Sequence, residues 1–288
     1  MDNKRLYSPK RVNEVVKKYK FKFSKSLGQN FLIDGNVVRK IVEEAGISKE
    51  DYVLEVGPGM GTLTEELALN AKKVVAVELD KNLRPVLKET LGKYENVEIV
   101  FGDILKLDLE EMIKDKMDDE KIKIVANLPY YITTPIIALF LENNYNIDSI
   151  NVMVQKEVAE RITASPNNKS YGSLSIFAQF YSDPEIVMNI AKTVFIPQPK
   201  VDSAVIRLKI TNKYPNVDQE NFFKIVKAAF SQRRKTILNT LSSGLDLDKD
   251  QIRKILEESQ IETNKRAENL SIEDYIKLSE KLVKLPPS

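Results

Sequence analysis

Short apolar runs alternate with amphipathic segments along most of the chain. Between about Val37 and Ile210, runs of four or five mainly aliphatic residues, typical of strands buried on both faces, are separated by stretches of helical periodicity. This alternation predicts an α/β domain built on a mostly parallel sheet. The seven expected strands span residues 52–56, 74–78, 97–101, 122–126, 150–154, 185–188 and 204–208.

Helical periodicity places the remaining elements. It appears at residues 36–45, 62–70, 82–92, 135–143, 156–164 and 172–181, and the last two strands, which have no helix between them, are expected to pair antiparallel. A turn-rich segment at 211–216 ends this pattern, and helices are expected at 218–230, 235–242, 249–259 and 271–284, the last capped by Ser271. The sequence thus predicts a large domain over 36–210 and a small all-α domain over 211–288.

Composition narrows the chemistry. The chain has no Cys and no His, which excludes zinc sites of thiolate or imidazole type and catalysis through Ser-His or Cys-His pairs. A Mg or Mn site made only of carboxylates stays possible, but no clustered Asp motif argues for one, so no metal is expected. No apolar stretch approaches the roughly 20 residues of a membrane span, and no apolar segment follows the charged N-terminus, so we expect a cytoplasmic protein.

A glycine-rich turn follows the first expected strand. Gly57, Gly59 and Gly61 form a G-x-G-x-G pattern that leads directly into a helix, the place at a sheet edge where α/β proteins bind nucleotides. The spacing is one residue shorter than the dinucleotide fingerprint, and Pro58 removes a backbone donor. The loop therefore favours an adenosyl amino acid, S-adenosylmethionine (SAM), over a pyrophosphate.

Acidic residues end or follow the next two expected strands. Glu78 stands 21 residues after Gly57, close to the spacing of about 20 at which a carboxylate binds a ribose diol. Asp103 follows the third strand and could accept a hydrogen bond from an adenine amino group. Either residue alone could simply cap the helix that follows. Together with the glycine loop they favour a SAM site.

The segment Asn127-Leu128-Pro129-Tyr130 follows the fourth expected strand. SAM carries its own electrophile, so the protein needs mainly to position a nucleophile. The Asn127 side-chain carbonyl and the Leu128 backbone carbonyl could accept hydrogen bonds from an adenine amine, while Pro129 shapes the turn and Tyr130 offers a flat face to a flipped base. An ordinary Asn-x-Pro turn before a core tyrosine is the alternative. Position beside the glycine loop favours the catalytic interpretation.

Positive charge is concentrated at the N-terminus. Residues 1–25 hold nine Lys or Arg against two acidic residues, so they carry +7, and the net charge of +2 leaves −5 on the rest. We expect residues 1–35 to form a basic arm and a lid over the cofactor site. The alternation of lysine and aromatic residues over 17–23 fits equally well an RNA surface, with Lys20, Lys22 and Lys25 on phosphates, or a strand with a core face.

The motif set resembles that of the ribosomal RNA adenine dimethyltransferases, and most closely their bacterial small-subunit (16S) type. The segments that carry the resemblance are 23–32, 55–61, 77–80, 102–103, 127–130, 195–203 and 230–236. It implies a class I SAM-dependent methyltransferase domain of Rossmann-like fold, with a helical C-terminal domain. The implied substrate is 16S rRNA within the small ribosomal subunit or its precursor, dimethylated at two adjacent adenines near the 3′ end.

The resemblance also assigns site residues. It implies SAM contacts at Asn30, Leu32, Gly57, Glu78, Asp103 and Asn127. Phe195 would stack on the target base opposite Tyr130, and the cluster Arg233, Arg234 and Lys235 would contact RNA, although such a run is often only a solvated face. We expect a monomer that binds neither membrane nor metal.

Two other functions are compatible with the pattern. One is a 23S rRNA adenine methyltransferase of the macrolide-resistance type, which shares the catalytic plan. The motif over 195–203 and Leu128 favour the small-subunit type. The other is an assembly or transcription factor that binds RNA without turnover, and the intact glycine, acidic and Asn-Leu-Pro-Tyr motifs argue against it.

Overall fold

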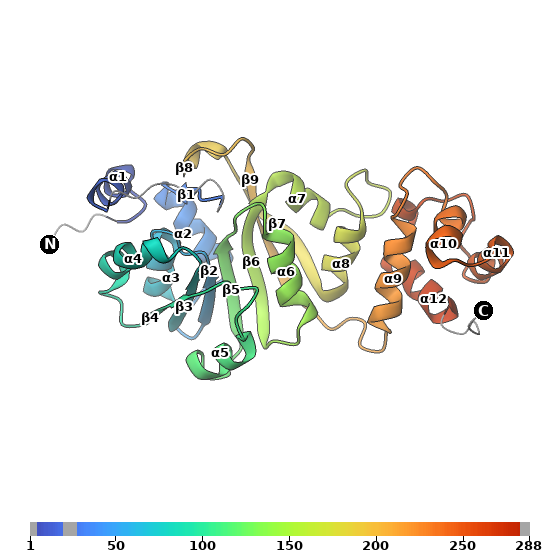
Figure 1. Ribbon diagram of the computed structural model, residues 1–288, viewed down its shortest axis with the longest axis horizontal. Coiled ribbons are helices and arrows are strands. Elements are labelled where there is room, and N and C mark those ends of the chain that lie inside the picture. The colour runs from blue at the N-terminus through green and yellow to red at the C-terminus, as the bar shows by residue number, and fades with distance from the viewer. Residues whose placement is uncertain (1–4, 20–27, 283–288) are drawn as a thin grey trace. The chain divides into compact units, whose positions relative to one another are not determined.

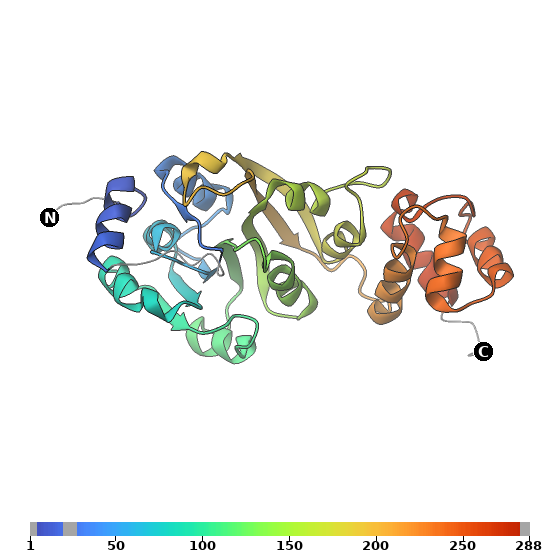
Figure 2. The same cartoon turned by 45° about the horizontal axis from the view of Figure 1, so that its top comes forward.

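The computed structural model describes residues 5–19 and 28–282. The chain divides into two compact units, residues 1–159 with 185–210 and residues 160–184 with 211–288 (Figures 1 and 2). The candidate RNA contacts Lys20, Lys22 and Lys25 lie outside the described residues. Each unit has a hydrophobic core of its own.

A seven-stranded sheet forms the centre of the first unit, in the order β4-β3-β2-β5-β6-β9-β7. The strands β2, β3, β4, β5 and β6 run parallel, and β9 is antiparallel to β6. The sheet therefore confirms the mostly parallel α/β fold, and all seven expected strands are present. Their bounds are β2 Tyr52–Val56, β3 Lys73–Glu78, β4 Val97–Phe101, β5 Ile122–Asn127, β6 Ile147–Gln155, β7 Ser182–Ile190 and β9 Ser203–Ile210.

The strand order reverses at β2. From β2 the chain adds β3 and β4 on one side, and it then returns to add β5 and β6 on the other. The segments that leave the carboxyl ends of β2 and β5 consequently move apart, which leaves a crevice between them. The glycine loop follows β2 and the Asn127 segment ends β5, so the topology brings the two motifs together.

Helices cover the sheet as the periodicity predicts. Val38 and Ile41 of α2 (Gly35–Glu44) and Leu67 of α3 (Thr62–Asn70) pack on Val53 and Val125 of the sheet. The expected helix at 82–92 begins as a 3₁₀ turn (Lys81–Leu83), in which the Asp80 side chain accepts from the Asn82 amide, and continues as α4 (Arg84–Leu91). The other helices of this region are α6 Thr133–Glu142 and α7 Lys156–Ile162.

Two α-helices and two short strands of the described residues were not expected from the sequence. They are α1 Pro9–Lys18, α5 Leu109–Lys116 and the strand pair β1 Phe31–Leu32 with β8 Phe195–Ile196. Helix α5 does carry ordinary local signals, because Asp108 caps it by accepting from the Glu111 amide (3.0 Å) and its last turn is basic. The pair β1 and β8 joins segments far apart in sequence, so no local pattern could reveal it.

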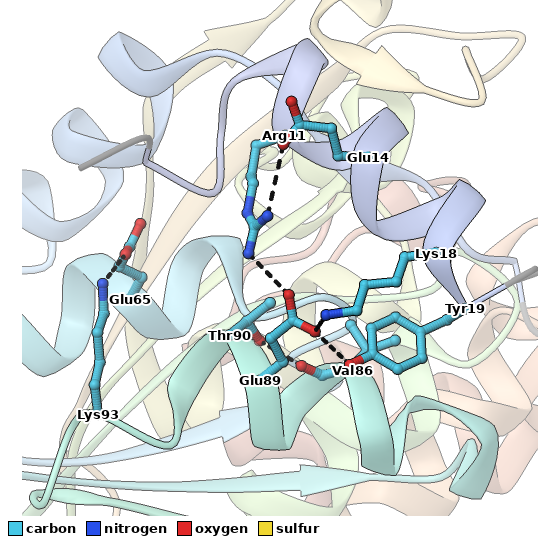
Figure 3. Close-up of polar contacts among 9 residues, drawn as sticks. All are labelled: Arg11, Glu14, Lys18, Tyr19, Glu65, Val86, Glu89, Thr90 and Lys93. Atoms are coloured by element: carbon cyan, nitrogen blue, oxygen red, sulfur yellow. Dashed lines mark hydrogen bonds and ion pairs between the residues drawn. The ribbon is translucent and has the colours of Figure 1, made fainter. Parts of the chain in front are cut away.

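Helix α1 docks on α4. Val12 and Val15 pack against Val86 and Leu87 in one apolar cluster. Beside this cluster the carboxylate of Glu89 accepts hydrogen bonds from Arg11 (3.1 Å), Lys18 (2.5 Å) and the Tyr19 hydroxyl, as Figure 3 shows. These donors, Lys18 and Tyr19 first, hold the pKa of Glu89 below its ordinary value. The described part of the expected basic arm is therefore a docked helix.

The helical unit extends further back along the chain than expected. Its core joins Ile176 and Phe180 of α8 (Ser173–Tyr181) to Phe222 of α9 (Gln219–Ala229), with the rings of Phe180 and Phe222 4.8 Å apart. Residues 160–184 thus belong with the C-terminal helices, whereas the periodicity had grouped them with the sheet. The remaining helices are α10 Ile237–Leu245, α11 Lys249–Glu258 and α12 Ile272–Leu282. Ser271 caps α12 as predicted, because its hydroxyl accepts from the Asp274 amide (3.1 Å).

Candidate active site

A pocket lies at the carboxyl ends of β2, β3, β4 and β5. Most of the site residues expected from the sequence line it, and they come from five separate segments of the chain. These are Asn30, Leu32, Gly57, Gly59, Glu78, Asp103, Asn127, Leu128, Pro129 and Tyr130. Gly61 and Phe195 are not among the lining residues. The parallel sheet thus brings together motifs that lie up to about a hundred residues apart in the sequence.

The glycines of the loop have different tasks. Gly57, Gly59 and Gly61 all have positive φ, at 73°, 59° and 88°, which favours glycine. A side chain on Gly59 would stand 2.6 Å from the ring of Phe31, so its absence lets Phe31 close over the loop. A side chain on Gly61 would meet Leu91 at 2.9 Å. Gly61 therefore allows α3 to pack near α4, and it does not line the pocket itself.

Glu78 and Asp103 accept hydrogen bonds from nearby backbone amides and also line the pocket. The buried carboxylate of Glu78 accepts from the amides of Gly59 (3.0 Å) and Asp80 (2.8 Å), which ties the glycine loop to the end of β3. Burial raises its pKa, although the backbone donors oppose this shift. Asp103 accepts from the Leu105 amide (3.1 Å). Capping and ligand binding are compatible here, because a carboxylate accepts several hydrogen bonds.

Glu55 is a pocket residue that the motif analysis did not single out. Its side chain is 1% exposed, and burial, with the nearby Glu78 carboxylate adding to it, raises its pKa to about 8. Its Oε2 has no hydrogen-bond partner among the described residues, and Glu55 lines the pocket. The sequence did contain a signal, because Glu55 is the single charge in the buried run of β2. A buried carboxyl oxygen without a partner calls for a donor, and a cationic ligand group would provide one.

Asn127 is held in one orientation at the end of β5. Its side-chain Nδ2 donates to the backbone carbonyl of Asn30 at 2.9 Å. The Asn30 side chain in turn donates to the Gly28 carbonyl at 3.1 Å. Because the amide nitrogen is engaged by Asn30, the Asn127 Oδ1 is the atom left to accept a hydrogen bond from a ligand. A carbonyl acceptor fixed in this way suits an amine nucleophile.

Tyr130 lines the pocket with its hydroxyl anchored. The Tyr130 hydroxyl and Ser203 Oγ are 2.6 Å apart, which links the segment to the first residue of β9. Partial burial raises the pKa of Tyr130, so the phenol is neutral at ordinary pH. The anchored hydroxyl leaves the ring as the group available to a flat ligand.

Phe195 occupies a different environment from the one the resemblance implies. It is 2% exposed and pairs through its backbone with Leu32, inside the core that α2 and α3 share with the sheet. Phe195 is not among the residues that line the pocket. Its cross-strand partner Leu32 belongs to the same core and does line the pocket, so Phe195 lies close behind the pocket wall.

The cationic cluster of the helical unit is partly structural. The Arg233 guanidinium donates to the carbonyl of Lys169 at 2.8 Å and to that of Tyr171 at 3.4 Å, so it fixes the loop before α8. Arg234 and Lys235 are exposed on the turn between α9 and α10. Those two residues are placed as a nucleic-acid contact requires, whereas Arg233 has a role within its own unit.

Two features are absent from the described part of the chain. No helix there is long and apolar enough to span a membrane. Within the same residues, no group of three or more acidic side chains is placed to hold a metal ion.

Comparisons with known proteins give one family. A family model described as ribosomal RNA adenine dimethylase matches residues 20–284. A ribosomal RNA small subunit methyltransferase A from Alkaliphilus oremlandii is 52% identical over 97% of this chain and 99% of its own length. A dimethyladenosine transferase structure from Plasmodium falciparum is 28% identical, with a TM-score of 0.74 over 88% of this chain and 98% of that one.

A solved structure named as a 23S rRNA methyltransferase is slightly less similar to this chain than the dimethyladenosine transferase is. The 23S rRNA methyltransferase ErmE is 26% identical, with a TM-score of 0.68 over 88% of this chain and all of that one. The range matched by the family model runs through both units and spans every motif segment described above. The pocket, the glycine loop and the Asn127 segment therefore belong to a SAM-dependent methyltransferase, and the chain is a member of the ribosomal RNA adenine dimethylase family.

Proposed function

We propose that the chain dimethylates two adjacent adenines near the 3′ end of 16S rRNA while the small ribosomal subunit is assembled. A relative named for the small subunit shares 52% of its residues with this chain, whereas the 23S rRNA enzyme shares 26%. The difference favours the small-subunit substrate. We further propose that the protein acts as a cytoplasmic monomer.

The pocket residues fit SAM group by group. Glu78 would accept from the ribose diol and Asp103 from the adenine amine, while Gly57 and Gly59 let the ligand approach the backbone. Asn30 and Leu32 would form the facing wall. The unpartnered Oε2 of Glu55 would receive the only ammonium group of this ligand. When bound, SAM supplies a methyl group on a positively charged sulfur.

The observation that carries the proposal is the fixed amide of Asn127. Its Nδ2 is held by the Asn30 carbonyl at 2.9 Å, so its Oδ1 can accept from the exocyclic amine of an adenine. The Leu128 carbonyl would accept the second amine hydrogen. Two acceptors draw the lone pair away from the ring and stabilise the positive charge that develops on nitrogen. Tyr130, anchored by Ser203, would stack on the base.

Contacts outside the pocket would position the rRNA. Arg234 and Lys235 present exposed cations on the helical unit, and such groups bind the phosphate backbone without reading its sequence. We also propose phosphate contacts for Lys20, Lys22 and Lys25. Their contribution should weaken as salt concentration rises, because binding releases counterions.

Labelled methyl transfer tests the proposal. The purified protein is incubated with SAM carrying a labelled methyl group and either undermethylated small subunits or 23S rRNA, with Asn127→Ala as the inactive control. We expect label in small-subunit rRNA as dimethyladenosine. Label in 23S rRNA alone would move the assignment to the macrolide-resistance type. No label in either RNA would support an RNA-binding factor without turnover.

A further inference from the structure

Tyr131 is an aromatic residue at the pocket that the mechanism above does not use. It is 57% exposed, more than any other large apolar side chain in the described residues, and it lines the pocket next to Tyr130. Burying an aromatic side chain is favourable, so an aromatic ring left open at the rim of a binding site is a candidate contact. Tyr130 is anchored through its hydroxyl, whereas Tyr131 presents most of its ring to solvent.

The backbone beneath Tyr131 is well fixed. The Pro129 carbonyl accepts hydrogen bonds from the Ile132 amide (3.1 Å) and the Thr133 hydroxyl (3.2 Å), which closes the turn into α6. Gly28 packs alongside, since a side chain there would stand 3.3 Å from Cδ1 of Tyr131. A ring on a rigid turn loses little conformational entropy when a ligand covers it.

The chemistry of the ring suggests its ligand. A neutral phenol attracts the flat face of a nucleobase more readily than it attracts a phosphate, and stacking on an aromatic side chain tolerates any base. The Cα atoms of Tyr130 and Tyr131 are about 3.8 Å apart, as in any trans peptide. Two rings this close can therefore hold the bases of neighbouring nucleotides in one strand.

We propose that Tyr131 is a second base-binding site, which stacks on the nucleobase beside the target adenine. The proposal rests on the proposed function, in which two adjacent adenines are modified. The neighbouring base, once unstacked, would gain a partner at the pocket rim, and this contact would help to hold the strand open while Tyr130 binds the target. The second adenine would be ready to enter when the first has been dimethylated.

Steady-state kinetics on undermethylated small subunits give the first test. Tyr131→Ala is expected to raise KM between about fivefold and about a hundredfold, the effect of losing one base stack, with little change in kcat. Tyr131→Phe keeps the ring and should retain the wild-type KM. Leu69→Ala removes an exposed apolar side chain of α3 that does not line the pocket, and it should have no effect. Equal KM values for the wild type and Tyr131→Ala would overturn the proposal.

Removal of the neighbouring base separates stacking from a structural role. Small subunits are reconstituted with rRNA that lacks the base on one side or the other of a single target adenine. At one of these positions the wild-type KM should rise, and Tyr131→Ala should raise it no further. Independent, multiplicative effects at both positions would contradict the proposal. Affinity for SAM, measured by calorimetry, should be the same in Tyr131→Ala and the wild type, and a lower affinity in the variant would indicate a structural role instead.

Intact undermethylated subunits, with every base present, distinguish failure of the proposed function from failure of the second base site. If the wild-type protein transfers no methyl group to intact undermethylated subunits, the proposed function is wrong. If it does, and the missing base and Tyr131→Ala act independently, only the second base site is wrong.

Discussion

Single side chains at the pocket act mainly by being held in place. Tyr130 is the clearest case, because the hydrogen bond between its hydroxyl and Ser203 fixes a ring that would otherwise rotate about its side-chain bonds. Ser203 begins β9, so the antiparallel strand beside β6 contributes directly to the site. The base-binding surface is therefore a property of two segments and not of the Asn-Leu-Pro-Tyr motif alone.

Substitution of Tyr130 should separate ring from hydroxyl. Tyr130→Phe loses only the bond to Ser203, whereas Tyr130→Ala also loses a stacking surface worth about 1 to 3 kcal/mol. We expect Tyr130→Ala to raise KM for small subunits by at least about tenfold more than Tyr130→Phe. Equal defects in the two variants would show that the hydroxyl, and not the ring, is the functional group.

Glu55 should make the stability of the ligand-free protein depend on pH. Its folded-state pKa is about 8, raised from about 4.5 by burial. Between these values the unfolded chain is ionised at Glu55 while the folded chain keeps the proton, so the free energy of unfolding falls as pH rises through this window. Glu55→Gln should remove this slope and be more stable than the wild type at pH 8, by an amount on the order of a few kcal/mol.

Urea unfolding at pH 6 and pH 8, without SAM, measures the Glu55 effect. Glu98→Gln serves as the control, because Glu98 lies at the surface in an ion pair with Lys116. The wild type and Glu98→Gln should both lose stability between the two pH values, and Glu55→Gln should lose less. An identical loss in all three proteins would show that Glu55 is ionised in the folded state.

At the scale of elements, helix α1 connects the N-terminal segment to the cofactor loop. The cluster that buries Val12 and Val15 also contains Phe31, whose ring lies against Gly59 of the glycine loop. The carboxylate of Glu89 holds α1 from the polar side through Arg11 and Lys18 (Figure 3). These two cations are therefore engaged within the protein, although the charge pattern alone groups them with the basic arm.

Removal of Glu89 should loosen α1 selectively. Glu89→Ala leaves α4 intact, because alanine favours helices, but it removes the acceptor of three hydrogen bonds. We expect amides of residues 9–18 to exchange with deuterium about tenfold faster, and the affinity for SAM to fall severalfold through Phe31. Glu98→Ala is the matched control, since it breaks an ion pair away from α1. Unchanged exchange in Glu89→Ala would mean that apolar packing alone holds the helix.

The elements that the sequence predicted are those with strong local patterns. The strands β2 and β4 begin and end at the expected residues, and Ser271 could be recognised as a cap from the acidic residues that follow it. The pairing of Phe195 with Leu32 depends on residues 163 positions apart, so no periodicity reveals it. The sequence assigns Phe195 to the active site only through the resemblance. In the structure its side chain belongs to the core cluster.

At the scale of the whole molecule, alternation of strand and helix hides the true extent of the helical unit. Helix α8 stands between two strands of the sheet, and its pattern therefore suggests an ordinary crossover. Its apolar side chains Ile176 and Phe180 instead pack on Phe222. The sequence shows that α8 has an apolar face but not which partner covers it. This is why the expected domain over 36–210 includes residues 160–184, although the structure also divides at 210/211.

A fragment tests this division. Residues 211–288 alone lack Tyr171, Ile176 and Phe180, which are buried in the core of the helical unit. Loss of several large buried side chains costs about 2 to 5 kcal/mol each, so this fragment should not unfold cooperatively on heating. Circular dichroism at increasing temperature provides the measurement. A sharp transition would show that 211–288 folds without residues 160–184.

The most direct test of the account concerns Asn127, whose Oδ1 is expected to accept from the reacting amine. Single-turnover methyl transfer to undermethylated small subunits and calorimetric titration with SAM are measured for the wild type and Asn127→Ala. The account predicts that Asn127→Ala lowers the transfer rate by about a hundredfold or more, the usual effect of removing a transition-state hydrogen bond, while its SAM affinity changes far less. Loss of SAM binding as the main defect, with normal transfer at saturating SAM, would contradict it.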